Sequence, residues 1–149
     1  MDYEASLNKA LDLLADGEDA KAHRILQAGI DHVKTRLAGK APAETPPLRE
    51  EYLHYYWGRF LTAMEEPEQA LLKFEKALKI NPGQEGSLWE TASLLLHELD
   101  KPELAKRLLS EKLLVLFPAN PLYREALAES EFLLRVRQAP PDPGEAEPA

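Results

Sequence analysis

Apolar residues return every three or four positions through nearly the whole chain, and this spacing constrains the fold more than any other feature of the sequence. Leu7, Leu11 and Leu14 form one such stripe near the N-terminus. No stretch alternates apolar and polar residues in the manner of a half-buried strand. The pattern therefore predicts an all-α protein.

Prolines and glycines interrupt the helical pattern and predict seven helices. The predicted spans are about 2–15, 18–38, 48–64, 67–80, 84–99, 102–116 and 121–137. Pro67 and Pro102 are expected to begin helices, because proline fits the first turn and the glutamate after each favours the positive helix N-terminus. Short turns predict hairpins at about 1–38, 48–82 and 84–118 and a last helix at 121–137. The sequence GKAPAETPP (39–47) reads as a Pro-rich linker, and 138–149 as a disordered tail rich in proline and acids.

A phrase that combines a helix stop, a glycine or proline, an acid and an alanine occurs three times. The copies are ADGEDA (15–20), EEPEQA (65–70) and DKPELA (100–105). They align Ala20 with Ala70 and Ala105; the last two are 35 residues apart, and the first two are 50 apart, one repeat plus the linker. A period near 34 residues with two helices in each unit indicates stacked helical hairpins.

The segment 51–84 resembles a tetratricopeptide repeat. The matching residues, in the order and spacing of that family, are Trp57, Gly58, Leu61, Ala70, Phe74, Ala77 and Pro82. A third unit at 86–118 matches less closely, with its proline one place late, and the first unit has Asn8 at the glycine position and Arg24 at the aromatic one. The resemblance implies an α-α superhelix of antiparallel helical hairpins, a TPR-like solenoid, with about three repeats and a C-terminal cap helix. The apolar residues expected to join this cap to the last hairpin are Leu122, Ala126, Leu133 and Val136.

An aromatic and basic cluster at 52–60 is the densest candidate for a binding surface. Helical spacing places His54, Trp57, Gly58 and Leu61 toward the partner helix of the hairpin, and Tyr56 and Phe60 toward the preceding hairpin. Tyr52, Tyr55 and Arg59 share the remaining face, which in the family lines a concave groove for peptides; a solvated face or contact with the linker is the alternative. The equivalent groove positions elsewhere are Lys9, Asp12, Leu13, Glu90, Leu94, His97 and Glu98.

The groove positions do not match the subset of the family that grips a C-terminal carboxylate with lysine, asparagine and arginine. Only Lys9 and Arg59 are positive, and no asparagine is among them. We therefore expect an apolar partner segment with some basic or polar character.

Catalytic and metal-binding patterns do not stand out in the sequence. It has no cysteine, no glycine-rich phosphate loop and no His-Glu-x-x-His. Its four histidines are expected to be ordinary surface or packed residues, and its carboxylates to stabilise helices. The net charge of −8 disfavours nucleic acid. We predict no catalytic residue, no metal and no cofactor.

The function that the sequence favours is a non-catalytic scaffold or adaptor that binds a peptide or helix of another protein in its groove. A homo-oligomeric assembly module is one alternative; a secretion-type or assembly chaperone is another, by analogy of size and charge alone. No apolar run is long enough to cross a membrane and the first residues do not resemble a signal peptide, so the expected location is cytoplasmic, whereas a periplasmic one would require a leader.

Overall fold

Helices account for all the regular structure in residues 1–42 and 45–138, which the computed structural model of the protein describes. The elements are α1 (Tyr3–Ala15), α2 (Asp19–Leu37), α3 (Glu50–Ala63), α4 (Pro67–Ile80), α5 (Glu85–Ser93), η1 (Leu94–Glu98), α6 (Pro102–Leu108), η2 (Leu109–Leu113), α7 (Leu114–Leu116) and α8 (Pro121–Gln138). The η elements are π-helical turns: α5 runs into η1, and α6 runs through η2 into α7. The described residues thus form seven continuous helices, which confirms the prediction of an all-α protein with seven helices.

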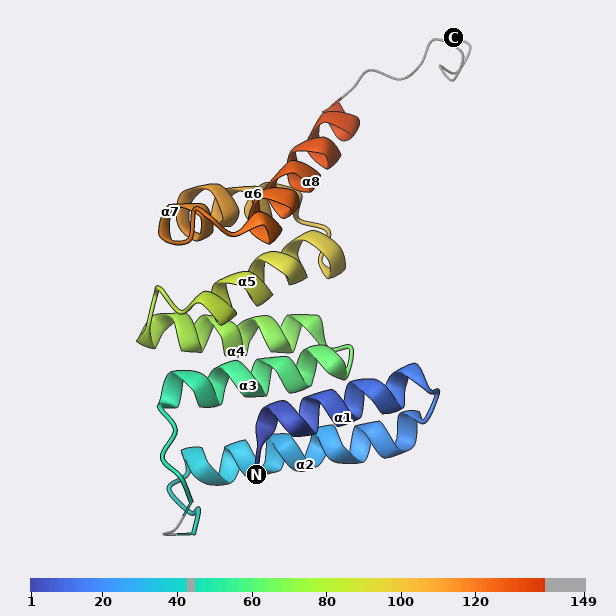
Figure 1. The fold of residues 1–149 in the computed structure, drawn as a ribbon, viewed down its shortest axis with the longest axis vertical. Coiled ribbons are helices and arrows are strands. Elements are labelled where there is room, and N and C mark those ends of the chain that lie inside the picture. Colours follow the sequence, from blue (N-terminus) through green and yellow to red (C-terminus); the bar gives the residue numbers. More distant parts are fainter. Residues whose placement is uncertain (43–44, 139–149) are drawn as a thin grey trace.

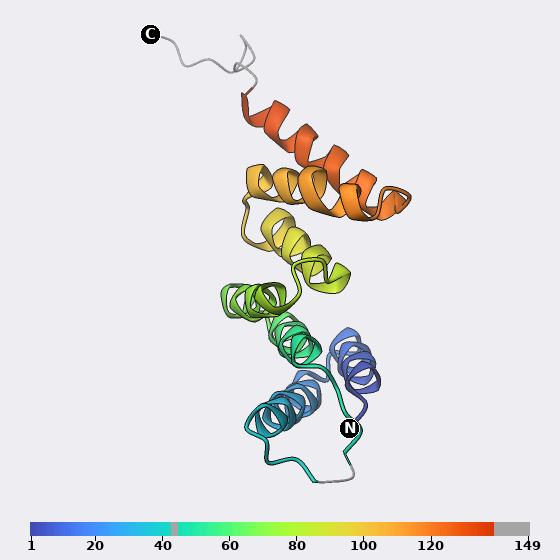
Figure 2. The same cartoon turned by 90° about the vertical axis from the view of Figure 1, so that its left-hand side faces the viewer.

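The helices follow one another along the long axis of the molecule, with α1 and α2 at one end and α8 at the other (Figures 1 and 2). Each packs mainly on its neighbours in sequence: α1 on α2, α3 on α4, and α5 on α6. Contacts also join α1 to α3, α3 to α5 and α6 to α8. The predicted helix bounds agree with these elements to within two residues, and Pro67 and Pro102 each begin a helix as predicted.

The pair α3 and α4 crosses closely because one residue at the crossing has no side chain. A β-carbon on Gly58 would lie 2.6 Å from Cε1 of Phe74, whose ring is fully buried. Ala70 and Ala77 of α4 are also fully buried, as the repeat pattern predicts. The ring of Phe60 then joins this pair to the preceding one, since it lies where a β-carbon of Gly29 in α2 would be.

The first pair shows the same packing, but in a register two residues away from the predicted one. Ala20 is exposed, whereas Ala22 and Leu26 are fully buried. Ala22 and Leu26 are four residues apart, as are Ala70 and Phe74, and Ala10 lies twelve residues before Ala22 as Gly58 does before Ala70. The alignment of Ala20 with Ala70, and with it the assignment of Asn8 and Arg24 to the glycine and aromatic positions, is wrong. The sequence phrases were aligned on turn residues, while packing depends on the buried face.

Compared with the first two pairs, the third pair, α5–η1 and α6–η2–α7, contains two extra residues, and a π-helical turn accommodates each of them. Ala92 and Ala105 are buried but thirteen residues apart, one more than in the other pairs. The turn η1 lies between them, with the amide of Leu99 donating to the carbonyl of Leu94, five residues back. The turn η2 lies likewise before Pro118, the proline that the sequence places one residue late. Because a π-turn adds one residue without ending the helix, the buried face is kept.

The helix α8 packs on the third pair through residues that the sequence did not single out. Tyr123 and Ser130 are buried together with the predicted Ala126, and the hydroxyl of Tyr123 donates to Glu85 Oε1 at 2.7 Å. The predicted Leu122 and Val136 are both exposed, which corrects that part of the expectation. Leu133 is partly buried against the core of the third pair, as predicted, so the packed face of α8 carries Tyr123, Ala126 and Leu133 and leaves out Leu122 and Val136.

The linker packs against the helices over the part that is described. The guanidinium of Arg36 donates to the carbonyl of Pro46, and Leu48 contacts the core formed by α1 to α4. Residues 43–44 and 139–149, which include nearly all of the predicted tail, lie outside the described residues. Among the helices that are described, none is both long and apolar enough to span a lipid bilayer.

Candidate functional site

One surface of the protein is formed by the first helix of each successive pair. A cavity of about 250 Å³ opens on it, and residues of α1, α3 and α5 line it together. The lining residues are Leu7, Leu11, Arg59, Thr62, Ala63 and Glu90. Since α1 contacts α3 and α3 contacts α5, the surface is continuous across three helices that are far apart in the sequence.

Arg59 is the charged centre of this cavity. Its Nη1 donates to Glu4 Oε1 at 2.5 Å, and its Nε lies 4.0 Å from Glu90 Oε1. The guanidinium carbon lies 5.6 Å from the centroid of the Tyr55 ring, a distance at which cation and ring attract each other. The single arginine thus ties α3 to α1 on one side and to α5 on the other.

The local charge around Arg59 is negative, because two carboxylates face one guanidinium. Burial raises the pKa of Glu90, and Glu4 adds to the increase, while Arg59 opposes it. A carboxylate that is partly removed from water is stabilised by any additional positive group that reaches it. The cavity is therefore suited to a segment that brings an apolar group together with a basic one.

Tyr55 was predicted to face a binding partner, but its ring packs between helices. Its ring lies 6.1 Å from that of Phe74 and 5.1 Å from that of Tyr56, between centroids. A β-carbon on Gly86 of α5 would come within 2.8 Å of the Tyr55 ring, so the ring is a spacer between the second and third pairs. Burial raises the pKa of its hydroxyl.

Tyr52 lies about two helical turns before Arg59 and contacts a different residue. Its hydroxyl accepts a hydrogen bond from Arg49 at 3.1 Å, and the Arg49 guanidinium lies 5.0 Å from its ring centroid. Arg49 in turn pairs with the buried Glu51 at 2.8 Å. Tyr52 therefore lies at the start of α3 beside Arg49 and does not line the cavity at Arg59.

The other predicted groove residues are divided among several surfaces. Lys9 and Asp12 are exposed, but Lys9 lines two shallow cavities between α1 and α2 and not the cavity at Arg59. Leu94 is only 2% exposed and packs in the core, so the expectation that it faces a partner is corrected. His97 is exposed and lies 3.2 Å from Glu129 of α8. Of these positions, Glu90 is the one that the structure brings to Arg59.

The register error explains which α1 residues were missed. In the observed register, the α1 residues equivalent to Tyr52, Tyr55 and Arg59 are Glu4, Leu7 and Leu11, 48 positions earlier. All three are at the Arg59 site: Glu4 by its ion pair, Leu7 and Leu11 by lining the cavity. Aligning the apolar stripes of the helices, in place of the turn phrases, is the sequence signal that would have found them.

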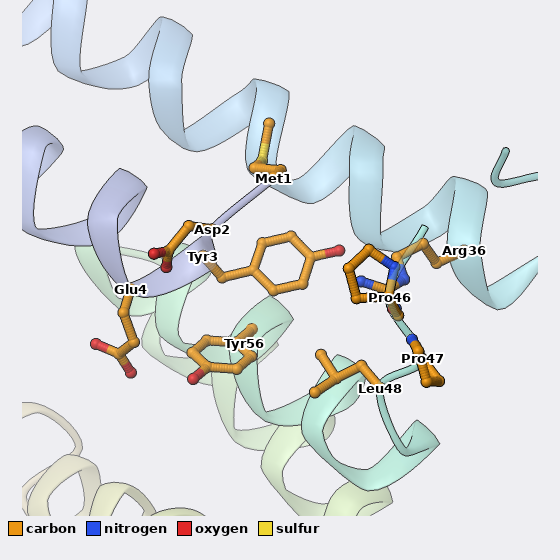
Figure 3. Close-up of a pocket in the computed structure, with 9 residues that line it drawn as sticks. All are labelled: Met1, Asp2, Tyr3, Glu4, Arg36, Pro46, Pro47, Leu48 and Tyr56. Carbon is orange, nitrogen blue, oxygen red and sulfur yellow. The ribbon is translucent and has the colours of Figure 1, made fainter. Parts of the chain in front are cut away.

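A second, larger cavity of about 450 Å³ lies where the linker passes the start of α1 (Figure 3). Its lining residues are Met1, Asp2, Tyr3, Glu4, Arg36, Pro46, Pro47, Leu48 and Tyr56. The lining combines two tyrosine rings with two prolines, and burial with the nearby Glu4 raises the pKa of Tyr56 to about 12. Glu4 lines this cavity and pairs with Arg59 of the first, so the two sites adjoin through one side chain. The sequence did not predict this cavity, because it depends on where the linker lies.

In the described part of the chain, no group of three or more histidine, aspartate or glutamate side chains is arranged to hold a metal ion. A scan against protein-family models finds no family that matches the chain, and a search of curated proteins finds no significant match. The described residues thus form an all-helical protein with seven helices packed as sequential pairs, and no family is identified.

Proposed function

We propose that this chain is a non-catalytic scaffold of the tetratricopeptide type, located in the cytoplasm, that binds a segment of a partner protein along the surface of α1, α3 and α5. The observation that carries the proposal is the cavity at Arg59, because three helices from three successive pairs each contribute to it. A buried alanine followed four residues later by a large buried apolar residue recurs in the pairs (Ala22 and Leu26, Ala70 and Phe74, Ala105 and Leu109) and supports a repeat architecture, in which such a surface is shared by consecutive units.

The chemistry of the surface limits which segment would fit. Leu11 is 45% exposed beside Ala63 and Thr62, and offers an apolar contact. Glu4 and Glu90 would attract a lysine or arginine of the partner, while Arg59 holds them in position. We propose a partner segment that carries an apolar side chain next to a basic one, in accord with the expectation from the sequence.

A peptide selection tests this proposal directly. A display library of random peptides is panned on the full chain, on Leu11→Asp and, as a matched control, on Leu72→Asp, which alters a leucine of α4 that is 58% exposed. The expected result is that the wild-type chain and Leu72→Asp enrich the same peptides, with an apolar residue beside a basic one, and that Leu11→Asp does not. Equal enrichment by both variants, or no enrichment by the wild type, would show that this surface is not the binding site.

Self-association is the second candidate, and the outer end of the first pair favours it. Leu13 and Ile25 are partly exposed there and line a shallow cavity together with Lys9 and Arg24. An end of a helical stack that shows apolar residues can dock on a second copy. Sedimentation at increasing concentration tests this, and a monomer at all concentrations would argue against it.

A further inference from the structure

A cluster of lysines surrounds the one tryptophan of α3, on the side of that helix away from Arg59. Trp57 is two residues before Arg59, so the two side chains lie about 200° apart around the helix axis. Nζ of Lys73 in α4 lies 3.7 Å from the centroid of the Trp57 ring, and Nζ of Lys34 in α2 lies 5.5 Å from it. Lys76 follows Lys73 by one helical turn. Two helices, α2 and α4, thus bring two ammonium groups to one indole ring, and a third lies one helical turn further along α4.

These lysines have no acidic counterpart among the residues that the structure describes. The ion pairs with N···O distances up to 4.0 Å include none of Lys34, Lys73 and Lys76. Asp31, one turn before Lys34, accepts a hydrogen bond from Gln27 at 3.0 Å. The positions three and four residues from Lys73 along α4 hold no acid, whereas ordinary solvated helices often place one there.

The positively charged lysines repel one another, which disfavours their charged forms. Burial lowers the pKa of Lys73, and the neighbouring Lys76 and Lys34 lower it further. The same two α4 lysines help to lower the pKa of His54, for which burial is the main cause and Glu50 acts in the opposite direction. The nearest carboxylate to that histidine is Glu50, 3.5 Å from Nε2 and largely exposed. An anion placed among the lysines would remove this repulsion.

The cluster is unusual for this chain, because the net charge of the whole protein is −8. A long polyanion such as nucleic acid would extend beyond the lysines and be repelled by the negative charge on the rest of the surface. A short acidic segment would meet mainly the local field, since salt screens charges beyond about 8–10 Å. The Trp57 ring attracts the ammonium groups of Lys73 and Lys34 by cation–π interaction and limits their freedom before binding.

We propose that Lys34, Lys73 and Lys76 around Trp57 form a second docking surface, which binds an acidic peptide segment of a partner protein. This lysine surface is independent of the cavity at Arg59, because it lies on the other side of α3. A scaffold with both surfaces would hold a basic and apolar segment on one side and an acidic segment on the other.

Titration calorimetry of the full chain with a capped pentaglutamate peptide tests the proposal. We expect saturable binding that weakens with added salt, and a loss of about tenfold or more in Lys73→Glu/Lys76→Glu, because each reversed lysine replaces an attraction by a repulsion. The control Lys106→Glu/Lys112→Glu makes the same change of net charge with two exposed lysines of the third pair. It is expected to bind within about twofold of the wild type, since distant surface charges are screened. Arg59→Ala is expected to bind normally, which separates this surface from the groove.

Three results would overturn the proposal. Equal binding by the Lys73/Lys76 variant and its control would mean that the cluster is not the site. Tighter binding of a single-stranded oligonucleotide of the same charge, lost in the same variant, would assign the surface to nucleic acid. Self-association in sedimentation that disappears with Lys73→Glu/Lys76→Glu would make a second copy of this acidic chain the occupant. Circular dichroism of both double variants checks that the helices are intact.

Discussion

The close approach of Gly58 and Phe74 makes a prediction that separates packing from helix propensity. In an exposed helix, replacing glycine by alanine stabilises by about 0.5–1 kcal/mol, because alanine loses less backbone freedom on folding. Here the added methyl would lie 2.6–2.8 Å from three carbons of the Phe74 ring. Carbon atoms in contact prefer about 3.5–4.0 Å, so the overlap is close to 1 Å. The ring is fully buried and has no open space into which to move.

Overpacking a filled core costs about 1–3 kcal/mol. Subtracting the gain in helix propensity leaves a net loss of about 0–2.5 kcal/mol for Gly58→Ala. The measurement is urea unfolding followed by circular dichroism at 222 nm, with Gly83→Ala as the control. The nearest atom to a β-carbon at Gly83 would be 3.7 Å away, so this control is expected to change the free energy of unfolding by less than about 0.5 kcal/mol.

A double-mutant cycle with Phe74→Leu shows whether the ring is the cause. The smaller leucine makes room for the methyl, so Gly58→Ala should cost nothing, or stabilise, when Phe74 is already leucine. The expected coupling energy between the two positions is about 1 kcal/mol or more. The reasoning is refuted if Gly58→Ala stabilises the wild-type background by about 1 kcal/mol, as it would at an open helical position.

Three further predictions concern other parts of the chain. Glu90→Gln should be more stable than the wild type at pH 7, because burial raises the pKa of Glu90 and its ionised form costs stability. The difference in free energy of unfolding between the two proteins should shrink as the pH falls and Glu90 takes up its proton; the same difference at pH 7 and pH 4 would contradict this. Deleting Glu98 should convert η1 to ordinary helix and leave the helical circular dichroism signal unchanged, whereas deleting Thr62, where α3 has no extra residue, should unfold the second pair. Equal effects of the two deletions would refute the role given to the π-turn. Tyr123→Phe should lower the free energy of unfolding by about 0.5–1.5 kcal/mol through loss of the bond to Glu85, and no change in urea unfolding would show that this bond contributes nothing.

The helical segments were predictable because their signals are local. Pro67 and Pro102 begin helices for a reason contained in the residue itself, its fixed φ and its missing N–H. The burial of Gly58 and Phe74 also followed from spacing along two adjacent helices. The register of the first pair was predicted wrongly, because Ala20 and Ala22 are both alanines close to a turn and the turn phrases favoured Ala20, whereas Ala22 lies on the buried face.

The candidate site was predictable only in part. Arg59 and Glu90 were singled out by helical spacing, and both line the cavity. Glu4 was missed, because the turn phrases set the first pair two residues out of register. Aligning the apolar stripes places Glu4 on the face of Arg59, but the packing of α1 on α3 decides that the two side chains, 55 positions apart, form an ion pair. The convergence of Lys34 and Lys73 on Trp57 was missed, since each lysine alone resembles an ordinary solvated residue.

Over the residues that the structure describes, the sequence by itself thus determined that the fold is all-α, how many helices there are and where they begin and end, because backbone geometry and apolar spacing act over a few residues. Tertiary structure alone decided which side chains meet across helices: the Glu4–Arg59–Glu90 grouping, the cavity beside the linker and the lysines around Trp57. The physical reason is that these groupings depend on the register and angle between helices. That geometry is set by the close contacts of a few buried residues, such as Gly29 with Phe60 and Gly58 with Phe74.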